Sequence, residues 1–151
     1  MIGPTDTDLS RRATAARALR LGGVLLWVAA AIHFLALPLL QHTVASRLPP
    51  EAYTFLWPPF ALSFILDGVL LVPLGFTALY CAGGVLRGER WARVLGLMSA
   101  LVVLSLPVVL VLVMGRGYFS ATPFLIATIV VSAAGLAMTV PLVRLIRHAA
   151  V

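Results

Sequence analysis

The chain contains no lysine, one cysteine and few charged residues. Of its 151 residues only 11% are charged, and all 11 basic residues are arginines. The absence of lysine excludes Schiff-base chemistry with pyridoxal phosphate or retinal, and it removes the lysine of a P-loop. The single Cys81 lies in an apolar stretch and belongs to no CxxC motif, so we expect a small core residue without redox function.

Apolar residues are abundant instead. They make up 62% of the chain, and the mean hydropathy is +1.08, whereas soluble domains are ~45–50% apolar and ~25% charged. A soluble domain of this length could not bury so much apolar surface, because small domains have a high ratio of surface to volume. The composition therefore predicts an integral membrane protein with one domain.

Four long apolar runs are separated by short polar segments. Each run is near the ~20 residues with which a helix crosses ~30 Å of hydrocarbon, and short connections make neighbouring helices antiparallel. We therefore expect an all-α fold, an up-down-up-down four-helix transmembrane bundle. Its transmembrane domain would cover residues 21–143, with spans at about 21–40, 58–86, 92–114 and 123–143, flanked by basic cytoplasmic segments at 1–20 and 144–151. The first run is too long for the core of a typical signal peptide, so we expect it to be retained.

The arginines are distributed unequally between the two sides of the expected bundle. One side carries Arg11, Arg12, Arg17, Arg20, Arg87, Arg90, Arg93, Arg144 and Arg147, and the other carries Arg47 and Arg116. Because basic residues favour the cytoplasmic side, this pattern predicts a multi-pass protein of the cell membrane with both termini in the cytoplasm. The arginines are scattered over short connections, so we expect no nucleic-acid partner despite a pI near 11.1.

Two ionisable residues lie inside the expected spans, where such groups are costly and often functional. His33 precedes the outer end of the first expected helix, and Asp67 follows the outer end of the second. Counting residues along the helices places them roughly 12 Å and 15 Å below the outer surface of the membrane. Each of the other two helices carries a serine at a similar depth, and two helices carry a further hydroxyl one turn outward. The predicted buried polar site comprises His33, Asp67, Ser105, Ser132, Ser63 and Thr128.

The pair of His33 and Asp67 has two interpretations. It is either a structural lock, in which one ionic hydrogen bond fixes the register of the first two helices, or a group that relays protons or contacts a ligand. For the serine and threonine residues, the alternative is a hydroxyl that bonds its own backbone. The protonation states of His33 and Asp67 stay open.

The spacing of the histidines disfavours a metal or a haem. His42 follows His33 by more than the four residues that place two ligands on one helix face, and His148 belongs to the opposite side of the bundle. We therefore predict no metal and no cofactor. A quinone held by His33 and Asp67 is the one cofactor alternative.

The longest connection, residues 41–57, is expected to form an outer loop over the polar site. Such a loop is a candidate lid or partner surface, and the alternative is an ordinary belt of aromatic residues and solvated charges. The residues assigned to this surface are His42, Arg47, Glu51 and Trp57.

The turn Arg87-Gly88-Glu89-Arg90-Trp91-Ala92-Arg93, together with the plan of four spans, resembles small bacterial four-helix membrane proteins of the DoxX-like kind. The layout covers most of the chain, whereas the motif covers a few residues, and Arg and Trp are common at an inner interface in any case. The resemblance implies a four-helix membrane fold, and some members resemble subunits attached to quinone-linked redox enzymes. No catalytic residue of that family is matched here.

The sequence contains no convergent catalytic set, so we expect a non-enzymatic subunit or interaction protein of a membrane complex. Its partners would be the lipid bilayer and either a larger membrane complex or further copies of the chain. Two alternatives stay open, both built on His33 and Asp67. One is a small-molecule or quinone-linked redox site, and the other is a pathway for protons or solutes.

Overall fold

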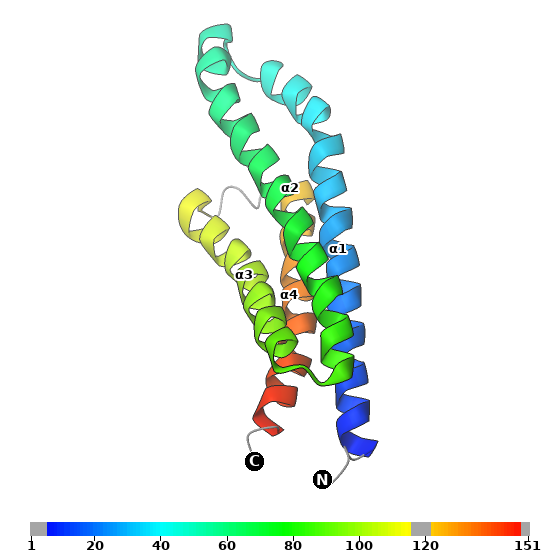
Figure 1. Cartoon of the computed structure of the whole chain (residues 1–151). Coiled ribbons are helices and arrows are strands. Elements are labelled where there is room, and N and C mark those ends of the chain that lie inside the picture. The colour runs from blue at the N-terminus through cyan, green and yellow to red at the C-terminus, as the bar shows by residue number, and fades with distance from the viewer. Residues whose placement is uncertain (1–5, 116–121, 149–151) are drawn as a thin grey trace.

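A computed structural model describes residues 6–115 and 122–148 of the chain (Figure 1). Its four helices are α1 (Asp6–Ala45), α2 (Pro50–Arg87), α3 (Arg90–Met114) and α4 (Thr122–His148). The described residues contain no strand. The prediction of an all-α fold with four helices is confirmed.

The helices pack in a closed ring. α1 packs against α2 and α4, α2 packs against α3, and α3 packs against α4. Consecutive helices are antiparallel, so both chain ends and the α2–α3 turn lie at one end of the bundle (Figure 1). We call it the basic end, because among the described residues it carries every arginine except Arg47. The opposite end, with the α1–α2 connection, is called the far end.

The first two helices are longer than the spans predicted from the sequence. With 40 and 38 residues, α1 and α2 extend about 60 Å and 57 Å at 1.5 Å per residue. With 25 and 27 residues, α3 and α4 extend about 38 Å and 40 Å. The α1–α2 hairpin therefore projects beyond α3 and α4 at the far end (Figure 1).

The predicted outer loop over residues 41–57 is mostly helical, so its predicted extent is wrong. α1 continues to Ala45 and α2 begins at Pro50, which leaves residues 46–49 as the connection. Proline is compatible with the first turn of a helix because its missing N–H has no partner there. The second span was predicted to begin near residue 58, whereas Pro58 and Pro59 lie inside α2.

The described part of the N-terminal basic segment, residues 6–20, also belongs to α1. The helix begins at Asp6, and Asp6 and Asp8 in its first turn interact favourably with the positive end of the helix dipole. The alanines and arginines that follow are good helix formers. Polar sequence before the first apolar run therefore continues the helix instead of ending it.

The α2–α3 turn depends on one glycine. Gly88 has φ 81°, a left-handed conformation that L side chains rarely adopt. Its N–H donates to the carbonyl of Val85 at 3.1 Å, and the N–H of Glu89 donates to the carbonyl of Gly84 at 2.9 Å. These bonds satisfy carbonyls at the end of α2, so α3 can begin two residues after Gly88.

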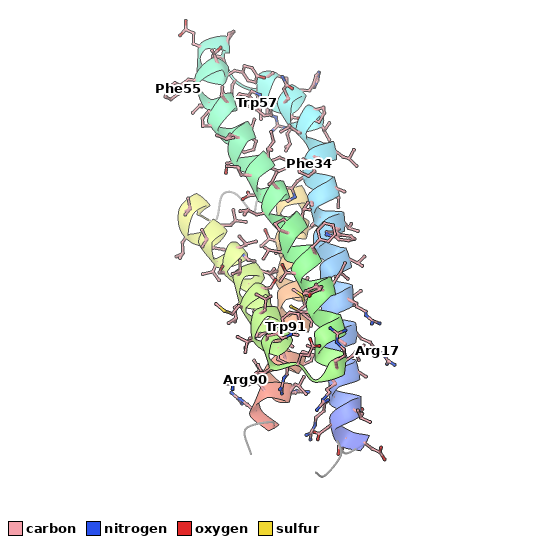
Figure 2. All side chains as sticks on the ribbon, in the orientation of Figure 1. Arg17, Phe34, Phe55, Trp57, Arg90 and Trp91 are labelled. Carbon is pink, nitrogen blue, oxygen red and sulfur yellow. The ribbon has the colours of Figure 1, made fainter. Side chains whose placement is uncertain are left out.

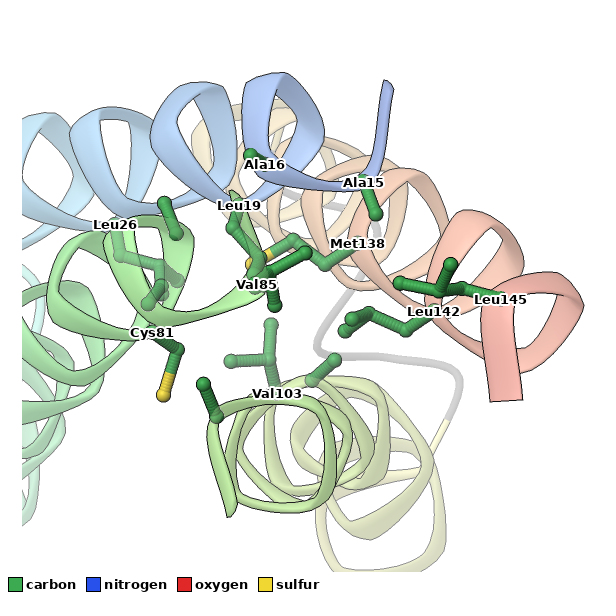
Figure 3. Packing of buried hydrophobic residues seen from close by; sticks show 14 of the residues in the cluster. Ala15, Ala16, Leu19, Leu26, Cys81, Val85, Val103, Met138, Leu142 and Leu145 are labelled. Carbon is green, nitrogen blue, oxygen red and sulfur yellow. The ribbon is translucent and has the colours of Figure 1, made fainter. Parts of the chain in front are cut away.

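The buried core lies in the half of the bundle nearer the basic end (Figure 3). Its largest fully buried side chains are Leu19, Leu26, Cys81, Val85, Val103, Met138 and Leu142. Cys81 is a free, buried thiol, and its predicted place in the core is confirmed. Small residues allow the helices to approach closely here, since a Cβ placed on Gly23 would lie 2.8 Å from the carbonyl oxygen of Gly75.

The outer surface of the bundle is strongly apolar. Leu35 and Leu112 are 80% and 78% exposed, and similar residues cover all four helices. Each helix is long and apolar enough to cross a membrane. Both the lengths and the outward-facing side chains agree with the prediction of a small membrane protein.

Candidate functional site

A cavity of about 230 Å³ lies between the four helices, on the far-end side of the core. Every helix contributes to its wall, and most lining side chains are leucine, isoleucine, valine, alanine, phenylalanine or proline. Three lining residues are polar: His33 from α1, Asp67 from α2 and Thr128 from α4. The cavity is thus an apolar chamber with a small set of polar groups, which is typical of sites for small ligands.

The edge of the core forms one wall of the cavity. Leu71 is 2% exposed, belongs to the core cluster and also lines the cavity. Leu106 and Val131 likewise pack against the core and line the cavity. The helices are therefore packed tightly on the basic-end side of these three residues, and the cavity lies on their far-end side.

His33 is held by its own helix and by α2. Its Nδ1 lies 2.9 Å from the carbonyl oxygen of Ala29, and because a carbonyl only accepts hydrogen bonds, Nδ1 carries the proton. Nε2 of the neutral ring is then an acceptor. The ring lies against Phe64 with centroids 4.7 Å apart, so the imidazole has one fixed tautomer and one apolar neighbour.

Asp67 lines the same cavity and is partly exposed to it. His33 is the titratable group that interacts with it electrostatically. Among the interactions of the described residues, no hydrogen bond or ion pair joins the two side chains directly, and none holds the carboxyl group. The two groups that the sequence predicted to meet therefore share a chamber without forming the ionic hydrogen bond of a lock.

The four hydroxyl residues of the predicted layer separate into two groups. Thr128 lines the cavity, and half-buried Ser132 lies one turn away, where it donates to the carbonyl of Thr128 at 2.7 Å. Ser105 is exposed and donates to the carbonyl of Val102 at 2.7 Å, while Ser63 is exposed on α2. Ser63, Ser105 and Ser132 do not line the cavity. For Ser105 and Ser132, the structure has the backbone-bonding arrangement that was the alternative.

The residues assigned to the outer loop lie on helices or beside them. His42 is in the last turn of α1, Arg47 is in the short connection and Glu51 is in the first turn of α2, and all three are exposed. Trp57 lies on α2 and is half-buried (Figure 2). These residues do not line the cavity.

An aromatic row runs along α2 from the far end to the cavity, and the sequence analysis did not identify it. Tyr53 stacks on Trp57 with centroids 5.9 Å apart, and Trp57 lies 5.8 Å from Phe60. Phe60 stacks 6.2 Å from Phe64, whose ring contacts His33. The spacing of four, three and four residues between these aromatics is the helical signal that could have identified the row.

The described residues contain no group of three or more His, Cys, Asp or Glu side chains that could hold a metal ion. His33 and Asp67 offer two groups in an otherwise apolar chamber. Their arrangement can hydrogen-bond a neutral, partly polar molecule, since Nε2 of the neutral His33 ring accepts a hydrogen bond and the Asp67 carboxyl and Thr128 hydroxyl groups line the same cavity.

No protein-family model, no curated protein and no solved structure matches the chain.

Proposed function

We propose that the chain is an integral protein of the cell membrane with four spans and both termini in the cytoplasm. The length and hydropathy of the four helices support this proposal. The gathering of the described arginines at the basic end supports the orientation, because basic residues are retained on the cytoplasmic side. In this arrangement the cavity lies within the outer half of the bilayer.

Within this protein, the cavity is proposed to bind a small amphiphilic molecule, with a quinone or quinol ring as the chemical class. The carrying observation is the meeting of His33, Asp67 and Thr128 in one apolar chamber of about 230 Å³. A cavity of ~150 Å³ is enough to hold benzene, so a single substituted ring fits this volume. The quinol form supplies the donor that the site needs, because its hydroxyl group can donate to Nε2 of His33, which is an acceptor. The ring would then pack among the apolar residues of the wall, which include Phe64.

The closed core argues against a pathway for protons or solutes through the bundle. On the basic side of the cavity the hydrophobic core consists of alanine, leucine, valine and methionine side chains and the thiol of Cys81, and Ser99 is the buried polar residue among the described residues. A proton path needs a succession of titratable groups or waters. The described core is almost entirely apolar, so it does not continue the polar lining of the cavity towards the basic end.

A ligand-binding role is compatible with a non-enzymatic subunit of a larger membrane complex. The layout of the chain resembles the DoxX-like proteins, some of which resemble subunits of quinone-linked enzymes. The chain would then hold the ligand for a partner that performs the chemistry. Copies of this chain could also serve as that partner.

The proposal is tested with the full chain in mild detergent, titrated with a short-chain benzoquinol under reducing conditions in an isothermal calorimeter. His33→Ala and Asp67→Ala are expected to weaken binding by about tenfold each, because each removes an acceptor for a hydroxyl group of the quinol in an apolar site. His42→Ala is the matched control, since His42 is exposed and outside the cavity. Its affinity should equal that of the unaltered chain.

Two results would contradict this function. One is the absence of saturable quinol binding by the unaltered chain. The other is a loss of thermal stability in His33→Ala and Asp67→Ala with no change in affinity for the quinol, which is the result expected of a structural lock.

A further inference from the structure

A second hollow lies at the basic end, between the start of α1 and the end of α4. It measures about 360 Å³ and is lined by Ser10, Arg11 and Thr14 from α1 and by Pro141 and Arg144 from α4. We call it the basic groove. It is separate from the cavity at His33, with which it shares no lining residue.

The lining of the basic groove suits a phosphate group. Two guanidinium groups reach it from different helices, and arginine is the side chain whose fork of donors matches phosphate oxygens best. Ser10 adds a hydroxyl group, whereas the hydroxyl of Thr14 donates to the carbonyl of Ser10 at 3.0 Å. Among the described residues, no carboxylate lines the groove. Asp8 is 4.0 Å from Arg11 in an exposed ion pair, and such a pair is weak enough to leave Arg11 available to another anion.

The basic groove lies level with the end of the apolar spans. Arg12 packs against Gly88, because a Cβ on Gly88 would collide with its guanidinium group. This contact places the first turns of α1 beside the α2–α3 turn, where Trp91 lies against Tyr80 at 5.3 Å. Arginine and tryptophan together are typical of the level of lipid headgroups.

Apolar surface continues from the basic groove towards the middle of the bundle. On α4, Val140 and Leu136 precede Arg144 by one and two helical turns and are 44% and 53% exposed. On α1, Leu21 follows Thr14 by two turns and is 58% exposed. A molecule with a phosphate in the groove could therefore lay hydrocarbon chains along both helices, which a free phosphate ion cannot do.

We propose that the basic groove binds the headgroup phosphate of an anionic phospholipid of the inner leaflet. Arg11 and Arg144 hold the phosphate from two helices, and the acyl chains follow the apolar faces of α1 and α4. Basic pockets between membrane helices on the cytoplasmic side are suited to anionic lipids. The bound lipid would link the first and last helices of the bundle. This inference rests on the proposed membrane orientation and is independent of the ligand of the cavity.

The test uses the full chain in neutral detergent, titrated with phosphatidylglycerol or phosphatidylcholine, with bound lipid counted by native mass spectrometry. The unaltered chain should bind phosphatidylglycerol more tightly than phosphatidylcholine. Arg11→Gln and Arg144→Gln should each weaken that binding by about fivefold, because each removes one guanidinium group from the phosphate. Binding of phosphatidylcholine should change little.

Arg90→Gln is the matched control, because Arg90 is exposed at the same end and does not line the basic groove (Figure 2). An equal loss in Arg90→Gln would overturn the proposal in favour of diffuse attraction to the basic end. Displacement of phosphatidylglycerol by an equal concentration of inorganic phosphate would overturn it in favour of a simple anion site. Benzoquinol binding is measured on the same samples, so failure of the lipid site and failure of the cavity site are distinguishable.

Discussion

The orientation of His33 follows from three neighbours. The carbonyl of Ala29 fixes the tautomer, Phe64 covers the ring, and Gly68 provides the space in which α1 and α2 approach each other. A Cβ on Gly68 would lie 3.1 Å from the Cβ of His33, which is closer than ordinary van der Waals contact. The glycine beside Asp67 therefore helps to bring the imidazole and the carboxyl group to the same cavity.

Replacement of this glycine gives a prediction at the scale of one residue. Gly68→Ala should lower the free energy of unfolding by about 1 kcal/mol. The steric cost of placing the methyl group against His33 and Phe34 is expected to exceed the gain in helix propensity from alanine. Gly83→Ala is the matched control on the same helix, where a Cβ would meet only the Arg87 guanidinium group, at 3.5 Å. This variant should gain ~0.5–1 kcal/mol. Unfolding in detergent measures both, and equal stabilisation would contradict the crowding argument.

Counting along the helices predicts the depth of a polar residue but not the direction in which its side chain points. His33, Asp67 and Thr128 line one cavity. Ser105 lies at a similar count along its helix but faces outward. Each residue turns a helix by about 100°, and a serine that bonds its own backbone is tolerated on an apolar surface. Depth alone therefore cannot place a hydroxyl group inside a bundle.

At the scale of elements, either of two proline pairs in the sequence is compatible with the start of α2. Pro49-Pro50 and Pro58-Pro59 are equal local signals, and the structure begins the helix at Pro50. The helical spacing of the aromatic row, which runs from Tyr53 through to Phe64, indicates that the helix extends across the second pair. Side-chain periodicity on both sides of a proline was thus more informative than the proline itself.

The α2–α3 turn also contains an ion pair between two side chains. Arg87 Nε lies 2.6 Å from Glu89 Oε1 across the glycine of the turn. This hydrogen bond holds the pKa of the Glu89 carboxyl group below its usual value. The carboxylate is therefore favoured in the folded chain, and the pair links the end of α2 to the start of α3.

The lowered pKa of Glu89 predicts a pH dependence of the turn. The contribution of Glu89 to stability is complete above the pKa of the unfolded chain and is lost as the pH falls through the lower folded pKa. Melting temperatures measured between pH 7 and pH 3 should fall less steeply in Glu89→Gln than in the unaltered chain. High salt should reduce the difference, because the pair is exposed. Identical pH profiles would show that the pair contributes nothing.

At the scale of the whole molecule, the bundle is asymmetric along its axis. Small residues join the helices in the half near the basic end, where the core is continuous. The cavity, the aromatic row and the projecting α1–α2 hairpin all lie towards the far end. In the proposed orientation, the cytoplasmic half stabilises the fold and the outer half holds the ligand.

This division gives a prediction about topology, and the single cysteine makes it testable. Cys81 is fully buried, so the unaltered chain should react with a membrane-impermeant maleimide neither in intact nor in permeabilised cells. In a Cys81→Ala background, Ser46→Cys lies at the far end and should be labelled in intact cells. Arg90→Cys lies at the basic end and should be labelled only after permeabilisation, because the eight arginines that remain at that end oppose its translocation. The reverse labelling pattern would show that the bundle has the opposite orientation. The cavity would then lie in the cytoplasmic half of the membrane, and the basic groove would lie outside.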